Sequence, residues 1–165
     1  MIDMDEYKLF RKEINAKIRK AKRALKQIDP DAENVSAKEF YDYMTGEIFS
    51  DDPTTLKDVL GNEFLLVHEL SEISELKKKG RIIDKKVIVD SPKTIVYEAH
   101  FKAMELELEY ALYKKDYHWA KFRLKQHKES VLENDPNLPE SLRSRGEEIF
   151  HKFKGLMDEH NMLQS

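Results

Sequence analysis

Apolar and aromatic residues recur at alternating spacings of three and four through the second half of the chain. Neither glycine nor proline occurs between Lys93 and Asn134. This repeat predicts one long helix over residues 92–133 that packs at a shallow left-handed angle on another helix. A straight helix of that length spans about 60 Å, more than a small domain can cover, so we expect part of it to leave the core, to bend, or to meet a second copy of the chain. The stripe consists of Val96, Ala99, Ala103, Leu106, Tyr110, Tyr113, Tyr117, Ala120, Leu124, His127 and Val131.

Five residues along this stripe are the candidates for the contact between copies, and we call them the seam. They are Tyr110, Tyr113, Tyr117, Leu124 and Val131. Tyrosine combines a large apolar ring with a polar hydroxyl, which suits the edge of a buried helix contact. The alternative is that the tyrosines line a ligand groove between helices.

The remaining hydrophobic pattern predicts an all-α bundle of about five helices in a single domain, residues 1–165. Apolar residues at spacings of three and four indicate the helices, and capping residues, glycine or proline mark their ends. Two short β-branched runs separated by three polar residues indicate a small hairpin or extended insert. Besides the long helix, the expected elements are helices over 3–28, 36–44, 54–79 and 139–160 and the insert over 81–90.

The amino-acid composition indicates the cellular compartment in which the chain is expected. Charged residues make up 37% of the sequence and cysteine is absent. This mixture is typical of intracellular proteins and leans towards a thermophile, where ion pairs are favoured. No apolar run is long enough to span a bilayer, so we expect a cytoplasmic protein without membrane contact.

The small net charge of −3 hides two opposite blocks. Residues 8–26 contain nine basic residues and one acid, whereas residues 29–75 contain thirteen acids and two bases. We expect the basic helix to lie on the acidic segment, within one chain or across a dimer. Nucleic-acid binding through Lys17, Lys20 and Arg23 is the alternative, which the scarcity of aromatic residues for base stacking disfavours.

Histidine and glutamate recur at spacings that could hold a metal ion. His68 and Glu72 are four apart on one helix face, and Glu69 lies beside them. His100 and Glu107 lie on one stripe of the long helix. If the two helices pack side by side, these five residues converge on one cation, Mg²⁺ or Mn²⁺. The structural alternative is a solvated helix face with ordinary hydrogen-bonded histidines.

Residues 66–73, with the sequence LVHELSEI, resemble the Glu-x-x-Glu half of the all-α nucleoside triphosphate pyrophosphatases (MazG-like). The resemblance implies acids on two helices that hold Mg²⁺ and position water against a phosphate. The family's other half is a later Glu-x-x-Asp step. Here the only such step, Glu39 to Asp42, comes earlier in the chain.

These observations support two functions. The heptad stripe, the separated charges and the lack of a complete catalytic motif favour a non-catalytic, self-associating scaffold that binds a protein partner and needs no cofactor. The His/Glu cluster supports the alternative, a divalent-metal-dependent nucleotide phosphohydrolase.

Overall fold

The computed structural model describes residues 2–50 and 52–164, and every regular element in them is a helix. The predicted all-helical class is confirmed, but the count of about five helices is not. The helices are α1 (Ile2–Ile28), α2 (Ala37–Met44), α3 (Leu56–Leu60), α4 (Glu63–Lys78), α5 (Val87–Asp90), α6 (Lys93–Tyr113), α7 (Tyr117–Gln126), the π-helical η1 (His127–Glu133), the 3₁₀ segment η2 (Glu140–Leu142) and α8 (Arg143–Gln164).

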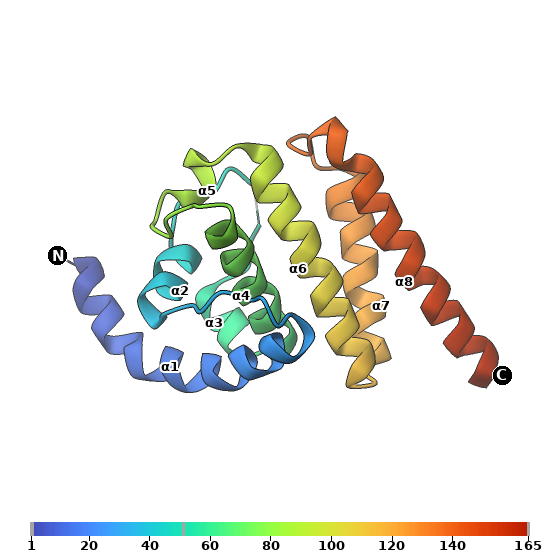
Figure 1. Cartoon of the computed structure of the whole chain (residues 1–165), viewed down its shortest axis with the longest axis horizontal. Helices are drawn as coiled ribbons and strands as arrows, with labels where there is room; N and C mark the ends of the chain where they lie inside the picture. The colour runs from blue at the N-terminus through green and yellow to red at the C-terminus, as the bar shows by residue number, and fades with distance from the viewer. Residues whose placement is uncertain (1, 51, 165) are drawn as a thin grey trace.

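Helix α6 crosses the middle of the molecule, with α1 to α5 on one side and α7 and α8 on the other (Figure 1). It packs most extensively on α4. Leu70 and Ile73 of α4 and Phe101, Met104 and Leu108 of α6 are almost completely buried. Polar side chains on the α4–α6 contact are therefore surrounded by apolar core and must find partners there.

Helix α1 forms where the amphipathic pattern predicts it. Its buried stripe packs against α2 and α4, while its opposite face is exposed. The stripe consists of Ile14, Ile18, Ala21 and Leu25, whose spacing of three and four keeps one side of the helix on the core.

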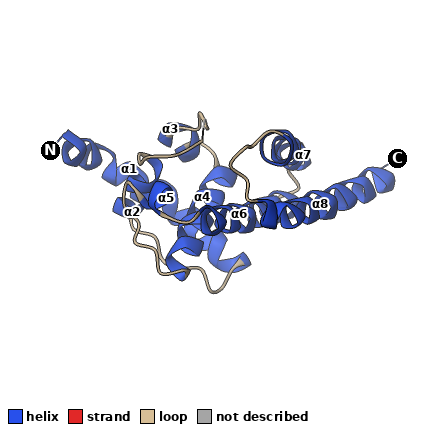
Figure 2. Cartoon of the chain, turned by 90° about the horizontal axis from the view of Figure 1, so that it is seen from above, coloured by secondary structure: helices blue, strands red, loops and turns tan. Residues whose placement is uncertain are grey.

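The predicted long helix over 92–133 is divided in the structure. It ends at Tyr113, and Lys115 adopts a left-handed backbone conformation with φ of 60°. Asp116 then caps the next helix, accepting a hydrogen bond from the Trp119 backbone N–H at 3.0 Å. Helix α7 turns back along α6, and it lies off the line of α6 and α8 when the molecule is seen from above (Figure 2). The seam residues are thus distributed over α6, α7 and η1 of one chain.

Two further predictions need correction. The helix expected over 54–79 is interrupted at Gly61, because Asn62 caps α4 by accepting hydrogen bonds from the next backbone N–H groups. The insert over 81–90 contains no strand. Asp84 Oδ1 accepts a hydrogen bond from the Lys86 backbone N–H at 2.9 Å, a local turn that leads into the single-turn helix α5 rather than a hairpin.

The last two helices close against α6. Gly146 of α8 allows close approach, since a Cβ there would lie 2.7 Å from Leu132 Cδ2 and 3.0 Å from Phe101 Cζ. His127, at the start of η1, donates from Nε2 to the Gly146 carbonyl oxygen at 2.8 Å. None of the helices in the described residues is both long and apolar enough to cross a membrane.

Candidate metal centre

The contact between α4 and α6 brings four of the predicted site residues together. His68 Nε2 lies 2.7 Å from Glu72 Oε2, and His100 Nδ1 lies 3.0 Å from the same oxygen. On the other side of the ring, His68 Nδ1 lies 2.8 Å from Glu107 Oε1. The spacing of four within α4 and of seven within α6 places both pairs on the facing sides of two adjacent helices.

Glu107 is at the closed end of this cluster and is completely buried. Arg123 of α7 binds it with two donors, Nε at 2.7 Å and Nη2 at 2.9 Å. The Trp119 indole N–H adds a third bond at 2.7 Å. Both carboxylate oxygens of Glu107 thus accept hydrogen bonds, which leaves neither of them available as a metal ligand. The geometry therefore does not support the prediction that Glu107 contacts the cation directly.

Glu107 instead fixes the orientation of His68. Burial alone would raise the pKa of Glu107, but the Arg123 guanidinium and His68 lower it to about 2. As a carboxylate it accepts a hydrogen bond from His68 Nδ1–H, which directs Nε2 at Glu72. A carboxylate behind a histidine in this way is the usual support of a metal-binding imidazole.

The cluster is charge-balanced as it stands. Burial would lower the pKa of His68, but Glu72 and Glu107 raise it to about 10, so its ring is cationic at neutral pH. Burial would raise the pKa of Glu72, yet His68 and His100 hold it well below its ordinary range. The two positive charges of His68 and Arg123 therefore balance the two negative charges of the Glu72 and Glu107 carboxylates. A bound cation would take the place of the proton on His68 Nε2.

The donor atoms that remain suit a metal ion. His68, Glu72 and His100 each offer one donor atom, and the three lie within 4.8 Å of one another. Ligands at bond lengths of about 2.1 Å lie about 3.0–3.4 Å apart. The spacings of 2.7 and 3.0 Å from Glu72 Oε2 to the two histidine nitrogens are close to this range. Two imidazoles and one carboxylate are a donor set of catalytic zinc and non-haem iron sites, which keep positions open for water or substrate.

One edge of the cluster is accessible from solvent. The His100 side chain is 25% exposed and that of Glu72 13%, whereas that of His68 is 3% exposed. Tyr43 of α2 donates its hydroxyl to Glu72 Oε1, which leaves Oε2 facing the two histidines. The His100 Nε2 atom is buried without a hydrogen-bond partner in the described residues.

Glu69 is beside the three donors but outside their hydrogen-bond network. Burial and the negative charge of Glu72 raise its pKa to about 8. Its carboxyl group makes no hydrogen bond to the described part of the chain.

Sequence reasoning missed Arg123, Trp119 and Tyr43. In one continuous helix, Glu107 and Arg123 would lie about 24 Å apart, so the prediction of a single helix excluded their contact. The turn at Lys115 brings them to 2.7 Å. Only an early recognition of the Asp116 cap could have indicated this pair.

The second half of the pyrophosphatase resemblance lies away from this centre. Glu39 pairs with Lys77 at 3.1 Å, and Asp42 pairs with Lys38 at 2.7 Å. Neither of these acids has a hydrogen bond to the His/Glu cluster.

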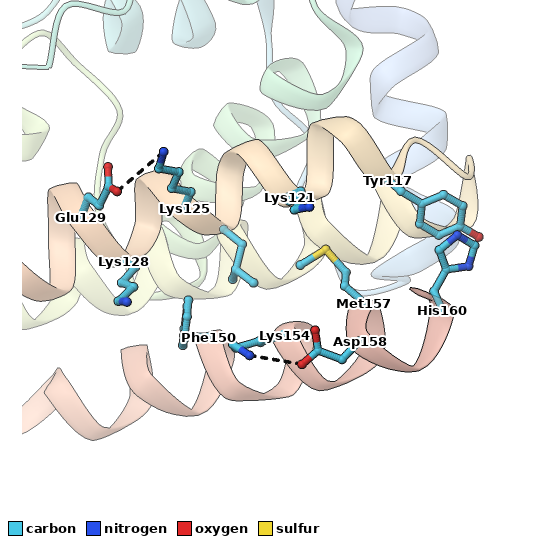
Figure 3. A pocket seen from close by; sticks show the side chains of 11 residues that line it. Tyr117, Lys121, Lys125, Lys128, Glu129, Phe150, Lys154, Met157, Asp158 and His160 are labelled. Carbon is cyan, nitrogen blue, oxygen red and sulfur yellow. Dashed lines mark hydrogen bonds and ion pairs between the residues drawn. The ribbon is translucent and has the colours of Figure 1, made fainter. Parts of the chain in front are cut away.

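The seam residues have separate environments. The Tyr110 hydroxyl donates to Glu63 at 3.1 Å, Tyr113 is 77% exposed, and Leu124 is buried. Tyr117 stacks on His160 of α8 with ring centroids 3.6 Å apart, at one end of a groove of about 360 Å³ between α7 and α8 (Figure 3). Val131 is half-buried in η1. Of the three tyrosines, Tyr117 lines this groove, together with Leu124.

The basic residues named from the sequence, Lys17, Lys20 and Arg23, are all exposed on α1 and lie outside the metal centre.

No protein-family model, curated protein or solved structure matches this chain at a significant level.

Proposed function

We propose that this protein binds one divalent transition-metal ion through His68, Glu72 and His100 and uses it to activate water against a phosphoanhydride. The observation that carries the proposal is the convergence of three donor atoms within 4.8 Å, with Glu107 positioned behind His68. Burying such a polar cluster is costly for a structural role alone, because apolar residues of similar size are often as stabilising or more so.

The donor set argues for Mn²⁺, Fe²⁺ or Zn²⁺ rather than Mg²⁺. Imidazole nitrogen suits the transition metals, whereas Mg²⁺ prefers oxygen ligands and retains much of its water. Of the two ions expected from the sequence, Mn²⁺ is therefore the better candidate.

The proposed reaction is hydrolysis, because three protein ligands leave coordination positions for water at the solvent-facing edge. Glu69 is the carboxyl group available beside that edge, where it can orient the attacking water. A nucleoside triphosphate is the proposed substrate, on the strength of the Glu-x-x-Glu resemblance in which Glu69 and Glu72 take part.

Metal binding is tested first, by native mass spectrometry and isothermal titration with Mn²⁺ and Zn²⁺ on protein stripped by a chelator. We expect one ion per chain in the native protein and at least a tenfold loss of affinity in Glu72→Gln, which keeps the shape but removes the charge. The control is Glu98→Gln, an exposed acid on α6 that leaves the cluster intact. Equal affinity in Glu72→Gln and the native protein would reject the site.

Hydrolysis is tested separately, by release of phosphate and pyrophosphate from the four common nucleoside triphosphates with Mn²⁺. Glu69→Gln should bind the ion with nearly native affinity but lose most of the turnover. A protein that binds the ion and hydrolyses none of these substrates would retain the metal site and reject the proposed reaction.

Self-association remains a second candidate function, and the groove between α7 and α8 is the observation that favours it. Its lining includes the apolar side chains of Leu124, Phe150 and Met157, the last two of which are labelled in Figure 3. Because Leu124 is 4% exposed, Leu124→Glu would disrupt the chain itself, so Met157→Glu is the cleaner variant. Light scattering after gel filtration should show a dimer that Met157→Glu dissociates; a monomeric native protein would end this interpretation.

A further inference from the structure

The exposed face of α1 carries an unusually regular line of positive charge. At 100° per residue, seven of the nine basic residues between positions 8 and 26 fall within an arc of about 120°. The line is about 27 Å long, and its centre lies about 110° around the helix from the centre of the buried stripe, so it flanks that stripe on one side. These residues are Lys8, Arg11, Lys12, Arg19, Lys22, Arg23 and Lys26, and we call them the basic line.

Helix α1 packs on α2 and α4, which belong to the acidic segment, as the sequence predicts, and the charge of Glu39 acts on Lys22. Ion pairs with this segment nevertheless do not neutralise the basic line. No residue of the basic line forms an ion pair within the described part of the chain, although Lys26 donates to the Ala32 carbonyl oxygen at 2.8 Å. Three acids of the segment are instead paired with lysines outside the basic line. Asp29 pairs with Lys78 at 3.2 Å, Glu39 with Lys77 at 3.1 Å and Asp42 with Lys38 at 2.7 Å.

A row of unpaired cations on a rigid helix is costly in self-repulsion and fits an extended polyanion. We infer that the basic line of α1 binds the phosphate backbone of a double-stranded nucleic acid, independently of base sequence. A row of Lys and Arg about 27 Å long on one side of a helix can contact several successive phosphates of a duplex.

The composition of this face selects a duplex over other polyanions. Single strands are held by aromatic side chains that stack on bases, but Tyr7 packs against Tyr41 with ring centroids 5.5 Å apart, and Phe10 packs against the core. A membrane-surface helix presents an apolar face to lipid. The apolar stripe of α1 is covered by α2 and α4, and Leu9 is the one large apolar side chain of α1 found exposed in the described residues.

Lys17 and Lys20 fall outside the basic line, since their directions around the helix differ from its centre by about 180° and 120°. Of the three residues named from the sequence, only Arg23 belongs to it. The proposed nucleic-acid contact therefore involves a largely different set of α1 side chains from the three named from the sequence.

The test measures binding of the full chain to a fluorescent 20-base-pair duplex by anisotropy, in 50–200 mM salt. With five to seven phosphate contacts, the logarithm of the association constant should fall against the logarithm of salt with a slope of about −4.5 to −6. Arg19→Glu/Arg23→Glu should weaken binding at least tenfold at 100 mM salt and reduce the slope by about 2.

The matched control is Lys121→Glu/Lys125→Glu, which reverses the same charge on exposed lysines of α7 and should change affinity less than threefold. Lys8→Glu/Lys12→Glu, at the other end of the basic line, provides a second variant whose folding is checked by circular dichroism. Equal weakening by the control, no effect of either basic-line variant, or binding to anionic phospholipid vesicles without binding to the duplex would each overturn the inference. Because the basic line shares no residue with the metal centre, Glu72→Gln should leave duplex binding unchanged.

Discussion

At the scale of single residues, Glu107 is the centre of the polar core. Its carboxylate accepts hydrogen bonds from His68, from Trp119 and from the Nε and Nη2 atoms of Arg123. The Glu107 side chain is completely buried. A carboxylate in this position is stable only while its cationic partners are present, because the surrounding core cannot solvate it. The stability of the α6–α7 contact should therefore depend on Arg123 out of proportion to its size.

We expect Arg123→Met to lower the free energy of unfolding by about 3–5 kcal/mol, since it leaves the Glu107 charge buried without its main partner. Urea denaturation measures this loss. Adding Glu107→Gln to Arg123→Met should recover at least about 1 kcal/mol, because the amide carries no charge to be desolvated. Lys125→Met, an exposed change on the same helix, should cost less than about 0.5 kcal/mol. A double variant as unstable as the sum of its parts would contradict this coupling.

His127 is the second buried titratable group whose state affects stability. Its Nε2–H donates to the Gly146 carbonyl oxygen, and its Nδ1 is buried without a partner in the described residues. Burial, together with the nearby Arg123 guanidinium, lowers the pKa of His127 from 6.5 to about 4. The folded state thus holds this ring neutral, whereas the unfolded chain takes up a proton near pH 6.5.

Because the folded pKa of His127 is lowered, its contribution to stability is complete above pH 6.5 and is lost as the pH falls towards 4. We expect the native protein to lose about 2–3 kcal/mol from this group over that range. In His127→Gln, which cannot titrate, the fall in unfolding free energy between pH 7 and pH 4.5 should be smaller by about this amount. His118→Gln, on the exposed face of α7, should behave like the native protein. Parallel pH profiles for His127→Gln and the native protein would show that another group controls acid stability.

At the scale of elements, the sequence predicts helices well and their interruptions poorly. The buried stripe of α1 and the apolar face of α4 follow from spacing alone, as does the pairing of His68 with Glu72. The turn between α6 and α7 could not be predicted from spacing, because its residues Lys114, Lys115 and Asp116 include no glycine or proline. A heptad stripe is also compatible with two antiparallel helices that pack on each other, so periodicity could not distinguish this hairpin from one long helix.

Lys115 provides a direct test of that hairpin. A lysine at φ of 60° is strained by its Cβ, and glycine is not, so Lys115→Gly should raise the free energy of unfolding by about 1 kcal/mol. If residues 92–133 formed one helix, the same change would instead destabilise the protein by about 1 kcal/mol. Urea denaturation measures the free energy of unfolding, and the sign of its change in Lys115→Gly distinguishes the hairpin from the single helix. Lys121→Gly, within α7, should be destabilising by about 1 kcal/mol and calibrates the measurement.

At the scale of the whole molecule, the candidate metal centre joins the two sides of the bundle. Its ligands come from α4 and α6, Tyr43 reaches it from α2, and Arg123 supports it from α7 on the other side of α6 (Figure 1). The sequence could place the ligands on two helices, but not the supports from a third and a fourth. An ion bound here would therefore contact a network that extends through most of the core.

This connection predicts that metal binding stabilises the entire fold rather than a local segment. An ion that binds only the folded chain adds about 2.7 kcal/mol at a concentration one hundred times its dissociation constant, which should raise the melting temperature by several degrees. The shift should appear in a single cooperative transition, measured by calorimetry with Mn²⁺ or Zn²⁺, and a chelator should reverse it. His100→Ala removes a ligand at the solvent-facing edge and should abolish the shift, whereas His151→Ala, an exposed histidine of α8, should preserve it. An equal shift in both variants would mean that the ion binds elsewhere on the surface, and that the buried cluster stabilises the helices by its own charge balance.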